Sequence, residues 1–271
     1  MIFSCPAKIN LSLKVVKKRL DGFHDIDSDF QFLNWGDKIE IIPAKKLSVS
    51  TKKIHVSQKE NLVTKALKKM ESFCNTKLNY SVNILKKIPI GSGLGGGSSN
   101  AATAMLAVNS VAKLNLSLDV LENIGKSLGS DIPFFLKGLS GKVSGIGEII
   151  EPKKFSEELI MILFPECSIS TKDAYRAITS EQILDKRDKL TGNFFEEWVL
   201  SNYPQVREAF DFISKKKKVN ISGTGSSLFT KIKSFEEGKE IMDNAPIKLG
   251  YVITNTINKS PLLDELLNSG V

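Results

Sequence analysis

Alternating apolar and polar residues predict several short strands in the first third of the chain. From Ile9 to Val15, apolar residues occupy every second position, as expected of a strand with one buried face, and Asn10 falls on the polar face. Similar patterns occur at residues 37–43, 47–51 and 80–85. We therefore expect a strand at each of these places.

Stretches with helical spacing lie between and after these strands. Residues 61–73 carry apolar side chains near every third or fourth position, and residues 101–112 form a largely apolar segment that must be mostly covered. A further helix is expected to open at Ser117 and Asp119 and to stop at Gly129. Strands and helices together predict an α/β fold for this part of the chain.

The pattern changes at residues 151–158, which are polar and contain a proline. A buried strand is expected directly afterwards at 159–164, and a capping box at 170–173 predicts the start of a helix. We therefore expect a domain boundary near residue 154.

Composition and charge narrow the range of partners. The 271 residues suffice for one large domain or two smaller ones, and the formal charge of +8 raises the question of a nucleic-acid partner. The basic runs at 17–19 and 215–218 are short and have no interleaved aromatic residues, which is typical of solvated surface. Small polyanionic substrates explain the same excess through electrostatic steering, so we expect no nucleic-acid partner.

Cysteine usage and the N-terminal segment indicate a protein of the reducing cytoplasm. The three cysteines lie far apart without a C-x-x-C pair, which argues against a disulfide framework and against a zinc site. The N-terminus lacks the pattern of a signal peptide, and no segment approaches the roughly 20 apolar residues that would span a bilayer. We expect a cytoplasmic protein with no membrane partner, present as a monomer or weak dimer.

The segment from Pro89 to Ala102 gives the strongest functional signal. Five glycines within residues 91–97 precede a helix that is expected to start near Ser98. Without Cβ atoms, backbone N–H groups can curve around an anion, and the helix start adds unpaired N–H groups and a positive dipole end. Ser98, Ser99 and Asn100 also suit a helix start. The sequence therefore predicts a site for the phosphates of a nucleotide.

Other interpretations of these glycines are weaker. A flexible linker would lack the ordered flanks, and no lysine follows the glycines as in a Walker loop. The spacing G-x-G-x-x-G also fits, with Asp119 at the distance of a ribose contact, but the loop follows 90 residues of chain instead of the first strand. A nicotinamide-dependent oxidoreductase is therefore a distant alternative.

Two charged residues are candidates for chemistry. Asp131 precedes the apolar run 132–135, which should draw it towards the interior, where a lone carboxylate needs a cationic partner. Lys8, at the start of a buried strand, is one candidate for that partner. A helix-end carboxylate and a strand-edge lysine explain the two residues equally well, and spacing alone does not pair them.

Three further features each allow a functional and an ordinary interpretation. The segment 21–24, Asp-Gly-Phe-His, fits a group that stacks on and hydrogen-bonds a planar base, and equally a hairpin turn with a surface histidine. A second glycine turn around Gly223 and Thr224 is either anion-binding or a simple hairpin. Asn61 and Lys86 fit an adenine or phosphate region, and equally a helix start and a strand-end charge.

Six segments together resemble the galactokinase, homoserine kinase, mevalonate kinase and phosphomevalonate kinase (GHMP) superfamily: residues 6–10, 21–24, 32–37, 91–102, 129–135 and 222–226. The triple glycine and the D-G-x-H element are similar to the members that phosphorylate the 2-hydroxyl of a cytidine-diphosphate polyol in the non-mevalonate isoprenoid pathway. The resemblance implies two domains with the site between them. These are an α/β domain over residues 1–154 (ribosomal-S5-domain-2-like) and an α+β domain over residues 155–271 (ferredoxin-like).

The resemblance also implies an ATP-dependent kinase with Mg²⁺ and assigns roles to individual residues. Asp131 is implied as the base for the substrate hydroxyl and Lys8 as its charge partner. The ATP loop would comprise Pro89, Gly91, Gly93, Leu94, Gly95, Gly96, Gly97, Ser98 and Ser99, with Ser98 or Ser99 near Mg²⁺. The acceptor site would comprise Asn10, Phe23, His24, Gly223 and Thr224. The family usually has tyrosine where Phe23 stands, so stacking is retained and any phenol contact is lost.

Two other functions compete with this one. A related GHMP kinase or an ATP-dependent decarboxylase would act on a mevalonate-type or sugar acceptor and ignore cytidine nucleotides. A basic nucleic-acid-binding protein would show salt-sensitive retention on DNA or RNA and no ATP turnover.

Overall fold

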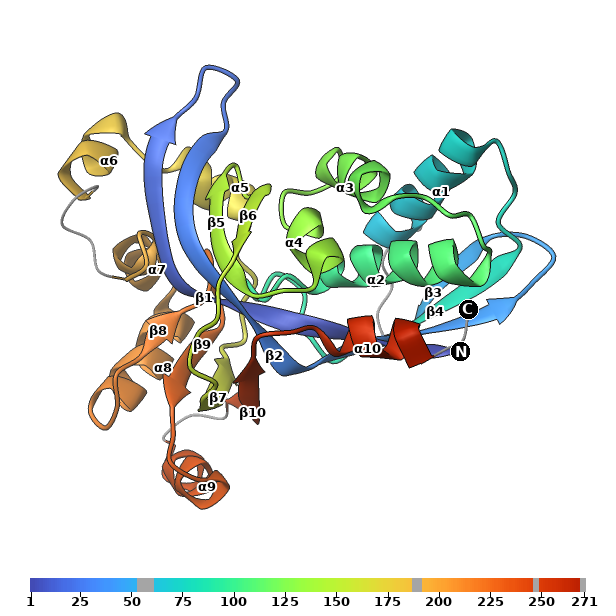
Figure 1. Ribbon diagram of the computed structural model, residues 1–271. Coiled ribbons are helices and arrows are strands. Elements are labelled where there is room, and N and C mark those ends of the chain that lie inside the picture. The colour runs from blue at the N-terminus through green and yellow to red at the C-terminus, as the bar shows by residue number, and fades with distance from the viewer. Residues whose placement is uncertain (53–60, 187–191, 246–248, 269–271) are drawn as a thin grey trace.

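Two long strands joined by a tight turn run through the molecule (Figure 1). In the computed structural model, which describes residues 1–52, 61–186, 192–245 and 249–268, β1 (Ile2–Lys18) pairs antiparallel with β2 (His24–Pro43). The register shifts between Pro6 and Lys8, because proline has no N–H for the ladder. The predicted strands at 9–15 and 37–43 are therefore parts of two much longer strands.

β2 organises the N-terminal layer because it pairs with several partners. It is antiparallel to β4 (Tyr80–Leu85) and to β5 (Gly141–Gly145), and these two bring in one further strand each. The added strands are β3 (Ser48–Lys52), parallel to β4, and β6 (Ile149–Pro152), antiparallel to β5. The strand predictions at 47–51 and 80–85 are confirmed.

Four helices cover one face of this layer, as Figure 1 shows. They are α1 (Leu62–Cys74), α2 (Gly96–Val111), α3 (Leu118–Lys126) and α4 (Ile132–Lys137). α2 lies among the other three and is buried along most of its length, as its apolar sequence predicted. It begins at Gly96, two residues before the predicted start, and its N-cap is Gly95 and not a serine.

The C-terminal part adds an antiparallel layer. β7 (Leu159–Phe164) lies between β10 (Gly250–Ile257) and β9 (Leu228–Lys231), and β8 (Asn220–Ile221) pairs with β9. The helices of this part are α5 (Thr171–Arg176), α6 (Ser180–Lys186), α7 (Glu196–Asn202), α8 (Pro204–Ser214), α9 (Phe235–Asp243) and α10 (Pro261–Asn268). The strand predicted at 159–164 is confirmed. So is the predicted cap, because the Ser170 side chain accepts a hydrogen bond from the Asp173 N–H.

The two parts share a sheet and a helix. β10 pairs with β2 through Thr256 and Ile257, which joins the two layers edge to edge. α10 then returns to β1, where the Glu265 carboxylate accepts hydrogen bonds from the Ser4 N–H at 2.7 Å and the Ser4 hydroxyl at 2.6 Å. The sheet is thus continuous from one layer to the other. Among the described residues, no helix is long and apolar enough to cross a membrane.

Candidate active site

The glycine loop between β4 and α2 takes a shape that side chains would disturb. Gly93 and Gly95 both have positive φ, of 76° and 71°. A Cβ on Gly93 would lie 2.3 Å from the carbonyl oxygen of Ser222, and one on Gly95 would lie 2.7 Å from the Phe135 ring. Glycine is therefore required at both positions by backbone conformation and by close neighbours.

The loop carbonyls are hydrogen-bonded to two distant parts of the chain. The Lys8 N–H donates to the Leu94 carbonyl at 3.1 Å, and the Ser222 hydroxyl donates to the Gly93 carbonyl at 3.1 Å. No backbone N–H of residues 91–95 donates to another group within the described ranges. The loop therefore offers N–H groups while its carbonyls are held, which is the arrangement that binds phosphate.

A cavity of about 1100 Å³ extends from this loop in two directions. The nucleotide end has Asn61, Leu62 and Lys86, the middle has Lys8, Asn10, Ser130 and Asp131, and the far end has Phe23, His24, Thr171, Tyr175, Gly223 and Thr224. Every residue predicted for the ATP loop lines it except Ser99. All five residues predicted for the acceptor site line it as well.

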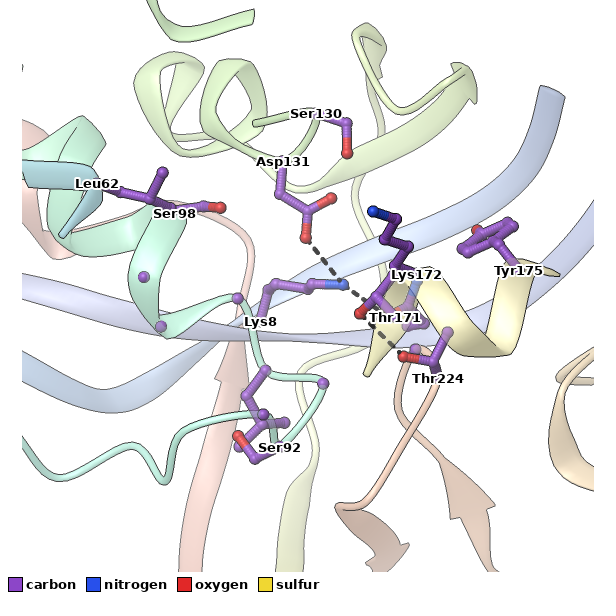
Figure 2. Close-up of a pocket in the computed structure, with 18 of the residues that line it drawn as sticks. Lys8, Leu62, Ser92, Ser98, Ser130, Asp131, Thr171, Lys172, Tyr175 and Thr224 are labelled. Atoms are coloured by element: carbon purple, nitrogen blue, oxygen red, sulfur yellow. Dashed lines mark hydrogen bonds and ion pairs between the residues drawn. The ribbon is translucent and has the colours of Figure 1, made fainter. Parts of the chain in front are cut away.

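Lys8 and Asp131 lie in the middle of the cavity, as Figure 2 shows. Lys8 Nζ is 3.5 Å from Asp131 Oδ2, although the two residues come from β1 and from the start of α4. The Lys8 side chain is 5% exposed and that of Asp131 is 27% exposed. Asp131 was expected to point towards the interior, but it faces the cavity. Burial lowers the pKa of Lys8, and the Asp131 carboxylate opposes that shift.

Neighbouring groups fix the direction of the Lys8 ammonium. It donates to Asn10 Oδ1 at 2.7 Å and lies 4.0 Å from the centre of the Phe30 ring. The Asn10 amide nitrogen donates in turn to the Ser28 hydroxyl at 3.0 Å. This hydrogen bond orients the amide so that its oxygen points to Lys8. Asn10 thus positions Lys8 as well as lining the cavity.

His24 is buried at the far end with one unpaired ring nitrogen. It is 6% exposed, so the interpretation as a surface histidine is wrong, and its Nε2 has no hydrogen-bond partner in the described part of the chain. Burial, and then the charge of Lys18, lower the pKa of His24, so the ring is neutral at pH 7. A buried nitrogen without a protein partner needs a ligand atom or an ordered water as its partner. Phe23 beside it is 57% exposed at the tip of the β1–β2 turn.

Tyr175 completes this end and was not predicted from the sequence. Its ring centre lies 5.3 Å from that of His24, and burial, and then the Asp131 charge, raise the pKa of its phenol. The capping box predicted the helix that carries Tyr175, but it did not predict that Tyr175 lies on the face of this helix that lines the cavity. At the start of the same helix, Thr171 Oγ1 is 3.2 Å from Thr224 Oγ1, which joins α5 to the second glycine turn.

The two serines at the start of α2 have different surroundings. Ser98 lines the cavity, whereas Ser99 is fully buried and its hydroxyl donates to the Pro6 carbonyl at 2.7 Å. Ser99 therefore ties the helix to β1, and its side chain does not face the cavity. No group of three or more His, Cys, Asp or Glu side chains that could hold a metal ion occurs in the ranges described.

Lys86 at the nucleotide end is held by a buried carboxylate. It forms an ion pair with Asp37, which is 1% exposed and also accepts from the N–H groups of Lys87 at 2.6 Å and Ile88 at 2.8 Å. The Asn100 amide on α2 donates to the same carboxylate at 3.0 Å. Lys86 therefore faces the cavity from a fixed anchor. Sequence reasoning assigned no role to Asp37, because nothing local distinguishes it from other strand carboxylates.

The loop geometry predicts the effect of one added methyl group. Replacing Gly95 with alanine places an L residue in the left-handed region, which costs about 1–2 kcal/mol, and presses its Cβ against Phe135. We expect ATP affinity to fall by about tenfold, measured by isothermal titration calorimetry. Gly250→Ala in β10 is the control, because its Cβ would lie 3.6 Å from its nearest neighbour, the Phe164 ring, which is an ordinary contact distance. Unchanged ATP affinity in Gly95→Ala would show that the loop does not hold the nucleotide.

Comparisons with known proteins agree with this geometry. Residues 61–139 match the GHMP kinases N terminal domain. A relative from Colwellia psychrerythraea, named 4-diphosphocytidyl-2-C-methyl-D-erythritol kinase, is 33% identical over 96% of this chain and 91% of its own length. A relative of the same name from Histophilus somni is 35% identical over 96% of this chain and 86% of its own length.

Solved structures show the same fold. A crystal structure of 4-(cytidine 5'-diphospho)-2C-methyl-D-erythritol kinase superimposes with a TM-score of 0.80 at 25% identity, covering 94% of this chain and 99% of that one. A mevalonate kinase superimposes with a TM-score of 0.65 at 14% identity, covering 96% of this chain and 100% of that one, which shows the fold alone. The expected GHMP architecture and the expected ATP-dependent phosphotransferase are thereby confirmed. The chain belongs to the 4-diphosphocytidyl-2-C-methyl-D-erythritol kinase family of the GHMP kinases.

Proposed function

We propose that this protein transfers the γ-phosphoryl group of ATP to the 2-hydroxyl of 4-(cytidine 5'-diphospho)-2-C-methyl-D-erythritol, in the non-mevalonate route to isoprenoid precursors. One observation carries the proposal. A single cavity joins the glycine loop, the buried Lys8–Asp131 pair and a partly aromatic end with an unpaired His24 nitrogen. The names of the relatives support the choice of acceptor.

The aromatic end suits a pyrimidine base. Phe23 and Tyr175 line the cavity there, and the neutral His24 ring offers Nε2 for a hydrogen bond to the base edge. Base stacking on aromatic rings contributes about 1–3 kcal/mol per base, and it does not need a hydroxyl on Phe23. Thr224 and Gly223 close the cavity opposite the start of α5.

The middle of the cavity suits transfer to a hydroxyl. The oxygen of the acceptor hydroxyl forms a bond to the γ-phosphorus of ATP, and Asp131 accepts the proton of that hydroxyl. At the same time the bond from the γ-phosphorus to the ADP oxygen breaks. Lys8 pairs with the Asp131 carboxylate at 3.5 Å, which positions it, and offsets charge on the transferred group. Because phosphoryl transfer leaves the protein little covalent work, holding these groups in line provides most of the catalysis.

The nucleotide end and the loop suit ATP. The free N–H groups of residues 91–95 and the ammonium of Lys86 face the phosphates, and Asn61 and Leu62 line the space beyond Lys86. Mg²⁺ usually keeps water and substrate phosphates as ligands and takes only one or two protein oxygens, so the Ser98 hydroxyl, which lines the cavity, fits it. When bound, the ion neutralises phosphate charge.

Three broader predictions also stay part of this proposal. We place the domain division between residues 154 and 155, where the polar segment joins β6 to β7. We place the protein in the cytoplasm, which three unpaired cysteines support. We take it to work as a monomer or weak dimer on small molecules, without a nucleic-acid or membrane partner.

A panel of acceptors tests the function. Purified protein with ATP and Mg²⁺ is expected to release ADP only when the cytidine-diphosphate methylerythritol is present, and not with mevalonate, galactose or homoserine. Phosphorus NMR should show one new phosphate monoester on the polyol. Turnover with mevalonate or a sugar would instead assign another GHMP activity, and salt-sensitive retention on RNA without ATP turnover would favour the nucleic-acid alternative.

A further inference from the structure

Lys172 is a cation of the cavity to which the chemistry above gives no role. It is the second residue of α5, it is exposed, and its side chain extends into the cavity that Asp131 also lines (Figure 2). Within the described ranges it forms no ion pair and no side-chain hydrogen bond. Its charge therefore has no partner among the residues that the structure describes.

α5 places Lys172 between the two ends of the acceptor site. Tyr175 follows three residues later, so both side chains lie on one face of the helix, and the Tyr175 ring packs near His24 at the base end. Thr171, directly before Lys172, contacts Thr224 on the second glycine turn. Lys172 thus projects from the stretch of helix between the base end and Asp131.

The acceptor has its negative charge in that same stretch. Its diphosphate joins the cytidine to the polyol, so it must lie between the base end and the Lys8–Asp131 pair, with a negative charge on each phosphate. Lys8 is already engaged by Asp131 and Asn10 and is buried. The Asp131 carboxylate by itself repels an anion, so the bridge needs a free cation nearby.

The other cations of this end are less suited to the bridge. Lys18 lies opposite His24 in the β1–β2 ladder, at the base end. Arg176, one turn beyond Lys172, is 3.8 Å from Asp173 on its own helix. Of these three, Lys172 alone combines a free ammonium with a place between the base and the reacting groups.

We propose that Lys172 binds the diphosphate bridge of the acceptor and so determines that the enzyme prefers a cytidine diphosphate to a cytidine monophosphate. The inference rests on the proposed function, because it takes the acceptor to be a cytidine diphosphate ester. Lys172 does not touch the reacting atoms in this proposal, so it sets acceptor affinity and not the rate of transfer.

Titration with cytidine, CMP and CDP tests this directly. With a non-hydrolysable ATP analogue saturating the nucleotide end, wild-type protein should bind CDP about tenfold more tightly than CMP. Lys172→Gln should lose that advantage and bind cytidine as the wild type does, and Lys172→Arg should recover most of it. Lys239→Gln, an exposed lysine of α9 outside the cavity, is the matched control and should behave as wild type.

Turnover separates this inference from the proposed function. Lys172→Gln should raise KM for the diphosphate acceptor about tenfold while kcat changes less than twofold, and the effect should shrink as salt rises. If the acceptor is turned over and the CDP preference survives in Lys172→Gln, the inference is wrong and the function stands. A weaker affinity of the variant for the ATP analogue would assign Lys172 to ATP and overturn the inference. If wild type neither binds cytidine nucleotides nor turns over the acceptor, both are wrong.

Discussion

Asp131→Asn is expected to lower kcat by about 10²–10⁴-fold while leaving the protein folded, because an amide cannot take the proton of the acceptor hydroxyl. Lys8→Met should lower kcat by about 10²–10³-fold, because it removes the partner that positions Asp131 and the charge that offsets charge on the phosphoryl group. Steady-state ATP turnover with saturating acceptor measures both effects. Equal activity in Lys8→Met would contradict the role given to this lysine.

The dependence of kcat/KM on pH distinguishes a role of Lys8 in the reaction from a merely structural role. Burial lowers the pKa of Lys8 from the ordinary 10.5, so its charge is present below that lowered pKa and is lost as pH rises through it. We expect kcat/KM to decline at a lower pH than an ordinary lysine would give, and this decline should be absent from the residual activity of Lys8→Met.

Stability should change with the opposite sign over the same pH range. Between the lowered pKa of Lys8 and 10.5 the unfolded chain binds more protons than the folded one, so the Lys8 contribution to the free energy of unfolding increases with pH. The alkaline loss of activity therefore does not come from unfolding through Lys8. Calorimetric melting temperatures of wild type and Lys8→Met across this range provide the check.

Asp37→Ala is expected to destabilise the protein by about 3–5 kcal/mol, the usual cost of removing one partner of a buried ion pair. The change leaves Lys86, two backbone N–H groups and the Asn100 amide without their acceptor at a site that is 1% exposed. Urea unfolding should show a lower midpoint with the same slope.

A matched exposed carboxylate provides the control for this change. Asp211 lies on the exposed face of α8, and Asp211→Ala should change stability by less than about 0.5 kcal/mol. Because Asp37 also anchors Lys86, Asp37→Asn should raise KM for ATP even if it remains folded at assay temperature. If the free energy of unfolding of Asp37→Ala lies within about 0.5 kcal/mol of the wild-type value, as expected for the control, the Asp37 carboxylate is not needed for stability.

Local sequence was sufficient where a pattern follows from one element alone. The strands at 80–85 and 159–164 and the cap at Ser170 were predicted because alternation and capping depend on neighbouring residues only. The first half of β1 was missed because Pro6 interrupts the alternation, and the bulge that absorbs it is visible only against β2.

The site was harder to predict from the sequence, because its residues are distant in the chain and come together only in the fold. Lys8 and Asp131 were both singled out, but only the packing of α4 against β2, where Phe134 stacks on Phe32, brings them to 3.5 Å. Nothing in the sequence near Tyr175 indicates that it lies beside His24 at the end of the cavity proposed for the pyrimidine. Asp37 is one strand carboxylate among several, and only the fold shows that Lys86 and Asn100 bind it. Residue type suggested the chemistry, and long-range pairing decided the partners.

The contact between the glycine loop and the second glycine turn has a consequence for protein synthesis. Ser222 and Ser227 bond to the carbonyls of Gly93 and Ser92, so the ATP loop takes its final shape only against residues made much later. During translation the ribosome releases the N-terminal layer first. A nascent chain therefore has its glycine loop long before it has an ATP site, and nucleotide can assist folding only in its last stage.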